Sequence, residues 1–188
     1  MRLRQSLTTS LVALISLFYL LAQFDHQLVG QLCLFYGGTY SNGYFPGVST
    51  GQWYRLFTVA LTHANLLHLL TNMWALYSIG NLVETVFGKS RYLIIFLVSL
   101  LTASLTSVFL GPHNIPGVGA SGAIFGLFGA LLVVGKRVGI NYRSVVSLVI
   151  LNLIITFSVP NIDWHAHIGG LIGGAMTTQI LVMRKKRA

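Results

Sequence analysis

Long runs without charged residues, separated by short charged segments, dominate the sequence. Asp, Glu, Lys and Arg are absent from residues 5–24, 56–83, 92–135, 144–162 and 164–183. A membrane-spanning helix needs about 20 apolar residues, so the run over 92–135 is long enough for two. Its middle, residues 111–117, has the Gly and Pro composition of a turn and divides the run. The pattern therefore predicts six membrane-spanning helices.

The composition supports a membrane protein and excludes several other classes. Hydrophobic residues make up 54% of the 188 residues and charged residues only 8%, too few to cover the surface of a soluble domain. The same composition excludes a disordered chain, and the single Cys33 excludes an internal disulfide. The net charge of +9 does not indicate nucleic-acid binding, because the basic residues are scattered between apolar runs instead of forming a patch.

The distribution of Lys and Arg predicts the orientation of the chain. With six helices and a cytoplasmic N-terminus, the cytoplasmic ends carry Arg2, Arg4, Lys89, Arg91, Lys136, Arg137, Arg143, Arg184, Lys185, Lys186 and Arg187. Of the 12 Lys and Arg residues, that leaves Arg55 alone on the outer side. Positive charge concentrated on one side is typical of cytoplasmic loops, so both termini are expected in the cytoplasm. The short cytoplasmic ends are typical of a bacterial plasma-membrane protein.

The chain is predicted to form a single all-α membrane domain over residues 1–188, with one long outer loop at about residues 25–55. This loop is rich in aromatic residues and Gly, which suits the boundary between membrane and water. The first run could instead be a signal peptide with Met1–Arg4 as its charged start. A retained helix is preferred, since the run is longer than a typical signal core and no clear cleavage site follows.

Polar side chains within the predicted spans are the candidates for chemistry, because they are unfavourable in lipid. At 1.5 Å per helical residue, Ser121, His167 and Asn72 lie about 21, 24 and 22 Å above the cytoplasmic ends of their helices. His68 precedes Asn72 by four residues and shares its helix face. Three helices are thus expected to bring a hydroxyl, an imidazole and a carboxamide to one depth.

These groups are the parts of acyl-transfer chemistry. A serine hydroxyl becomes a strong nucleophile when a nearby base takes its proton, and a histidine at the same depth can do so. A carboxamide and a second imidazole can donate hydrogen bonds to an oxyanion. Gly119 and Gly122 allow close backbone approach beside Ser121. A zinc protease is excluded because the sequence has no HExxH motif, and no metal or cofactor is expected.

The motifs around these residues resemble those of the rhomboid intramembrane serine proteases. Gly119–Gly122 resembles the family's GxSG motif, and Ala166–Gly174 resembles its AHxxGxxxG motif. His63–Asn72 resembles the HxxxxHxxxN pattern of the second helix, and Trp53–Arg55 the Trp-Arg element of the first loop. The resemblance runs from about Trp53 to Gly174, nearly the whole predicted membrane core.

The resemblance implies a serine endopeptidase that cleaves transmembrane segments of other proteins near their outer ends, within the lipid bilayer. Ser121 would be the nucleophile and His167 the general base and acid. Asn72 and His68, with the backbone N–H of Ser121, would form the oxyanion hole. Many family members carry Tyr where this chain has Phe125, which keeps the ring but not the hydroxyl.

Four glycines give this hypothesis a structural basis. Gly122 and Gly126 are four residues apart, as are Gly170 and Gly174, and small residues at this spacing let two helices come close. Contact through these faces would bring Ser121 and His167 within reach of each other. Asp163 could orient His167 from one turn away.

Two other function classes remain open. A catalytically inactive relative could bind transmembrane segments as a chaperone or adaptor, although the intact Ser121, His167, Asn72 and His68 favour an enzyme. A small transporter or channel would need polar groups along a path through both leaflets. The nearly apolar cytoplasmic halves of the predicted spans argue against such a path.

Overall fold

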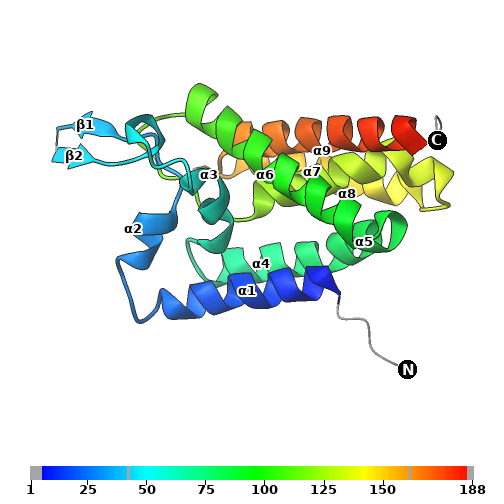
Figure 1. Ribbon diagram of the computed structural model, residues 1–188, viewed down its shortest axis with the longest axis horizontal. Coiled ribbons are helices and arrows are strands. Elements are labelled where there is room, and N and C mark those ends of the chain that lie inside the picture. Colours follow the sequence, from blue (N-terminus) through cyan, green and yellow to red (C-terminus); the bar gives the residue numbers. More distant parts are fainter. Residues whose placement is uncertain (1–5, 42, 161, 186–188) are drawn as a thin grey trace.

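The computed structural model describes residues 6–41, 43–160 and 162–185, and most of them are helical. The α-helices are α1 (Leu7–Leu21), α2 (Leu28–Leu32), α3 (Arg55–Thr58), α4 (Leu66–Ala75), α5 (Asn81–Phe87), α6 (Lys89–Leu110), α7 (Ser121–Val134), α8 (Tyr142–Ser158) and α9 (Trp164–Lys185). A short hairpin of β1 (Gly38–Tyr40) and β2 (Gly43–Phe45) lies at the end of the molecule opposite to the start of α1 and the end of α9 (Figure 1). Arg2, Arg4, Lys186 and Arg187, which contribute to the predicted charge asymmetry, lie outside the described residues.

Each predicted span contains helical residues, but the helical segment that starts with α4 begins later than expected for the second span. Residues 55–61 form two short helices, α3 and η2 (Val59–Leu61), and the backbone becomes extended at Thr62. The long segment starts only at Leu66, because Asn65 caps it by accepting a hydrogen bond from the His68 backbone N–H at 2.9 Å. His63 therefore lies in the connection before α4 and is not part of the same helix as His68.

Among the residues that the structure describes, two helices are long and apolar enough to cross a membrane, namely Lys89–Leu110 and Trp164–Met183, while Leu7–Leu21 and Tyr142–Ser158 are apolar but shorter. The other two predicted spans do not form single long α-helices. The second is divided by a π-helical turn, η3 (Leu76–Gly80), between α4 and α5. The fourth is the 14-residue α7, which begins at Ser121.

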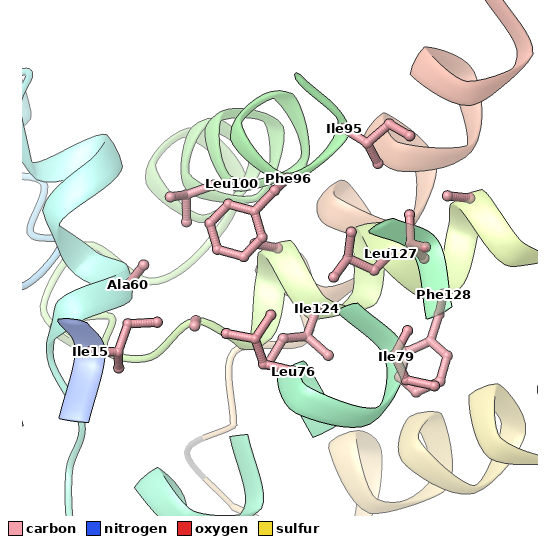
Figure 2. Packing of buried hydrophobic residues seen from close by; sticks show 14 of the residues in the cluster. Ile15, Ala60, Leu76, Ile79, Ile95, Phe96, Leu100, Ile124, Leu127 and Phe128 are labelled. Carbon is pink, nitrogen blue, oxygen red and sulfur yellow. The ribbon is translucent and has the colours of Figure 1, made fainter. Parts of the chain in front are cut away.

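Helix α7 is the central helix of the molecule. Its side chains are buried on every side, which is typical of a helix that contacts other helices all round. Figure 2 shows Ile124 and Leu127 of α7 between Phe96 and Leu100 of α6 and Leu76 of η3. The apolar core is thus built around the helix that begins with Ser121.

Glycines bring the backbones of α7 and α9 into direct contact. A Cβ atom on Gly170 would overlap the Gly122 carbonyl oxygen, and one on Gly174 would overlap the Gly126 carbonyl oxygen. The other side of α9 is equally close to α6, because a Cβ atom on Gly173 would overlap the Thr102 side chain. Small residues thus allow α9 to fit against α6 and α7, the three helices seen packed together in Figure 1.

Arg55, the basic residue expected on the outer side, is buried inside the outer loop. Its guanidinium donates to the carbonyl oxygens of Gly30 and Cys33 at 2.8 and 2.7 Å and to the Gln52 side chain at 2.7 Å. These bonds satisfy a charge that is only 4% exposed. The arginine therefore ties together two segments of the loop that are more than 20 residues apart in sequence.

Glu84 of α5 caps the N-terminus of α1. Its carboxylate accepts hydrogen bonds from the backbone N–H groups of Leu7 and Thr8 and from the hydroxyls of Ser6 and Thr8, at 2.8–2.9 Å. The first N–H groups of a helix have no partner within it and attract negative charge. Although burial alone would raise the pKa of Glu84, these bonds lower it from 4.5 to about 2.

The substitution Gly174→Ala is expected to lower stability. The new methyl group would meet the Gly126 carbonyl oxygen, part of the α7 backbone, and only separation of the two helices could relieve the overlap. We expect about 1–3 kcal/mol of destabilisation, measured as a lower midpoint of thermal unfolding in detergent. Gly30→Ala is the matched control, because nothing lies within 4 Å of a Cβ atom there. Equal midpoints for the two variants would contradict the close contact.

Glu84 should make stability depend on pH. A carboxylate whose pKa is lowered to about 2 by folding contributes its full stabilisation above pH 4.5 and loses it as the pH falls towards 2. Glu84→Gln should reduce stability at neutral pH by about 1–2 kcal/mol and flatten the decline between pH 4.5 and 2. Unfolding midpoints measured across this range check both effects. Asp25→Asn, which removes a carboxylate from an exposed site, should leave the decline in place.

Candidate active site

Ser121 is the first residue of α7, and its local backbone depends on glycine. Gly119, two residues earlier, has a φ of 111°, a conformation that residues with a side chain rarely adopt. Among the described residues no side chain caps the start of α7. The first N–H groups of the helix, including that of Ser121, are therefore free of a side-chain acceptor and lie next to the hydroxyl.

The hydroxyl of Ser121 and the ring of His167 are in contact. His167 Nε2 lies 2.8 Å from Ser121 Oγ, across the contact between α9 and α7. The His167 side chain is only 7% exposed, whereas Ser121 is half-buried. The structure therefore brings together the two residues for which the sequence predicted equal depth, in hydrogen-bond geometry suited to proton transfer.

The two candidate oxyanion donors lie on α4. A Cβ atom on Gly119 would lie 2.9 Å from His68 Cε1 and 3.0 Å from His68 Nε2, so the His68 ring lies directly against the backbone that leads to Ser121. Asn72 is 7% exposed and uses one N–H of its amide on the His68 carbonyl oxygen at 3.0 Å. An amide nitrogen has two protons, so the second remains for an oxyanion.

The His167 ring is held from two further directions. Phe125 stacks on it, with ring centroids 4.2 Å apart and an angle of 13° between the planes. The second ring nitrogen, Nδ1, lies 2.8 Å from the hydroxyl of Thr156 on α8. The sequence pattern does not single out Thr156. Its signal is a hydroxyl within a predicted span, the type of position at which polar groups are unfavourable unless they have a partner. The same run also contains Ser147 and Asn152, so this signal is shared.

Asp163 does not contact the His167 ring through its carboxylate. Its oxygens accept hydrogen bonds from the Ser107 hydroxyl of α6 and from the Ala166 backbone N–H at 3.2 Å, and lie 3.4 Å from His165 Nδ1. Asp163 therefore caps the start of α9 and ties it to α6. The contact with the second His167 ring nitrogen, for which Asp163 was considered, is made instead by Thr156.

The outer loop and the turn over residues 111–117 pack against each other beyond the helix ends. Tyr36 and His113 stack with ring centroids 3.7 Å apart, and Leu34 pairs with Gly117 through backbone hydrogen bonds. The Tyr40 hydroxyl donates to the His113 carbonyl oxygen at 2.8 Å. The two segments thus form one structural unit.

The chemistry available at the site is that of a serine nucleophile with a histidine base. In the part of the chain that the structure describes, no group of three His, Cys, Asp or Glu side chains is arranged to hold a metal ion. The Cys33 thiol is buried and lies 3.8 Å from Arg55 Nη1, in the outer loop. The contact between Ser121 and His167 is an arrangement in which a histidine base can activate a serine hydroxyl.

Known proteins share this sequence pattern over most of the chain. Residues 50–184 match the family model of the Rhomboid domain. The rhomboid protease GluP of Bacillus subtilis is 40% identical over 149 residues, which cover 75% of this chain but 28% of GluP. YdcA of the same organism, named as a candidate rhomboid protease, is 33% identical over 77% of this chain and 75% of its own length.

A plant relative extends the comparison. RHOMBOID-like protein 5 of Arabidopsis thaliana is 32% identical over 145 residues, which cover 73% of this chain and 47% of that protein. The chain thus spans about a quarter of GluP and about half of the Arabidopsis protein, but most of YdcA. The matched region contains α4, α7 and α9, which carry the candidate site, and on this basis the chain belongs to the rhomboid family of membrane-integral proteins.

Proposed function

We propose that this protein is an intramembrane serine endopeptidase that uses Ser121 as nucleophile and His167 as general base. The observation that carries the proposal is the distance of 2.8 Å between His167 Nε2 and Ser121 Oγ, which are 46 residues apart in sequence. The names of the Bacillus relatives support the same reaction class.

The proposed reaction proceeds in two steps. Ser121 Oγ attacks the carbonyl carbon of the scissile peptide bond while His167 Nε2 takes the hydroxyl proton. The resulting imidazolium gives this proton to the leaving amine, which departs and leaves an ester on Ser121. Water then attacks the ester with His167 again acting as base, which releases the new carboxyl end and restores the serine.

The negative oxygen formed in each step needs hydrogen-bond donors. The Ser121 backbone N–H, at the uncapped start of α7, is one. The His68 ring against Gly119 and the remaining amide proton of Asn72 are the others. These donors come from two helices whose relative position is fixed by the core, so they need not be reorganised during the reaction.

The proposed substrates are transmembrane segments, and the cut lies towards the outer side. Six membrane crossings with both termini in the cytoplasm would put the start of α7 in the outer half of the bilayer, about 21 Å from the cytoplasmic end of its 14 residues. A substrate helix must unwind locally, because a regular helix engages its own carbonyl groups. The Bacillus relatives support a bacterial plasma membrane as the location.

Ser121→Ala and His167→Ala should each lower cleavage of a single-span test protein by more than about a thousandfold, because the nucleophile and its base act as one unit. The assay uses purified protein in lipid vesicles and measures product by mass. Ser78→Ala and His26→Ala change exposed residues of the same types and should cleave normally. Undiminished cleavage by either site variant would reject the proposal. Wild-type protein that retains test segments without cleaving them would favour an inactive adaptor.

Asn72→Ala should lower kcat by about a hundredfold and leave KM nearly unchanged, because an oxyanion donor acts mainly in the transition state. Steady-state kinetics on the same substrate separate the two constants. Thr71→Ala is the control at the adjacent residue, whose hydroxyl is exposed and bonds only to backbone oxygens of its own helix. A change in KM alone would instead assign Asn72 to substrate binding.

A further inference from the structure

Both nitrogens of the His167 ring contact a hydroxyl group. Nε2 lies 2.8 Å from Ser121 Oγ, and Nδ1 lies 2.8 Å from Thr156 Oγ1. Thr156 is 3% exposed and is one of the few buried side chains of α8, together with Val145 and Val149. A neutral imidazole carries one proton, which can reside on either nitrogen, and the hydrogen bond at one nitrogen decides the state of the other.

The Thr156 hydroxyl already donates its one proton to a hydrogen bond within α8. Thr156 Oγ1 lies 2.7 Å from the Asn152 carbonyl oxygen one turn earlier in α8, and a carbonyl oxygen can only accept. The hydroxyl therefore donates to Asn152 and presents a lone pair to His167. It follows that His167 Nδ1 carries the ring proton and donates it to Thr156. Nε2 is then unprotonated and faces the Ser121 hydroxyl as an acceptor.

The stacking of Phe125 does not determine which ring nitrogen of His167 faces Ser121. A ring flip of His167 exchanges its two edges but leaves its plane, and therefore the contact with Phe125, nearly unchanged. The carboxylate of Asp163 does not determine it either, because its oxygens contact Ser107, His165 and the Ala166 N–H instead of the His167 ring. Thr156 is thus the polar side chain that distinguishes Nδ1 from Nε2 on the side away from Ser121.

We propose that Thr156 is a positioning residue that holds His167 as the Nδ1-protonated tautomer, with Nε2 directed at Ser121. This inference rests on the proposed role of His167 as general base. In serine proteases with three-residue sites a carboxylate does this work, but an unpaired carboxylate inside a membrane protein is strongly unfavourable. A hydroxyl that donates its hydrogen bond to a helix carbonyl can accept one from the imidazole. It therefore selects the same histidine tautomer without a buried charge.

Replacement of Thr156 by residues of similar size tests whether its hydroxyl affects the rate of cleavage. Thr156→Val keeps the shape and removes the acceptor, and it should lower kcat about tenfold with KM unchanged, the loss expected for one hydrogen bond. Thr156→Ser restores the hydroxyl and should remain within about twofold of wild type. Thr177→Val is the matched control, because that hydroxyl also bonds a carbonyl four residues earlier in its helix, that of Gly173. It should cleave normally.

A spectroscopic measurement separates positioning from a loss of packing. Protein labelled with ¹⁵N in histidine, compared with a His167→Gln sample to assign the signals, should show a protonated Nδ1 and an unprotonated Nε2 for His167. In Thr156→Val the signals should shift towards a mixture of tautomers, and Thr156→Ser should retain the wild-type pattern. A protonated Nε2 in the wild type, or an unchanged pattern in Thr156→Val, would overturn the inference.

The two readouts distinguish failure of this inference from failure of the proposed function. Wild-type protein that cleaves, together with a Thr156→Val variant within about twofold of it, rejects Thr156 while the serine protease stands. Wild-type protein that does not cleave rejects the protease. The tautomer measurement still decides in that case whether Thr156 orients the ring, because it requires no substrate.

Discussion

The contact between the backbones of α7 and α9 is the constraint on which the candidate site depends. Packed helices usually have axes about 8–10 Å apart. At that distance, two side chains on facing helices must be long to touch each other. Gly122 and Gly126 face Gly170 and Gly174 so closely that a methyl group on either of the latter would overlap a carbonyl oxygen. The short side chain of Ser121 can reach His167 because these helices nearly touch.

The same contact explains the location of the site within the bundle. Helix α7 is buried along its length and begins at Ser121, so this residue lies at the end of a helix that the core surrounds. His167 lies in the first turn of α9, whose start is tied to α6 by the bond between Asp163 and Ser107. His167 and Ser121 are therefore held by separate attachments to the same core.

Much of this arrangement could be predicted from the sequence, because membrane-spanning segments follow from uncharged runs and depth follows from residue counts. These rules predict that Ser121 and His167 lie at the same depth. The spacing of the glycines predicts that their two helices come close. Thr156 could not be predicted in this way, since its contact with His167 depends on the rotation of α8. The run over residues 144–162 contains several other polar side chains, and the sequence does not show which of them faces the ring. The late start of α4 also depends on a local bond, the Asn65 cap, which competes with continuation of the helix.

The cap of α1 by Glu84 has a consequence for biosynthesis. Leu7 and Thr8 precede the carboxylate that accepts their N–H groups by 77 and 76 residues. When α1 leaves the ribosome, Glu84, whose carboxylate caps its first turn, has not yet been synthesised. The start of the first helix therefore lacks this carboxylate until α5 arrives beside it, and only then is its anchoring complete.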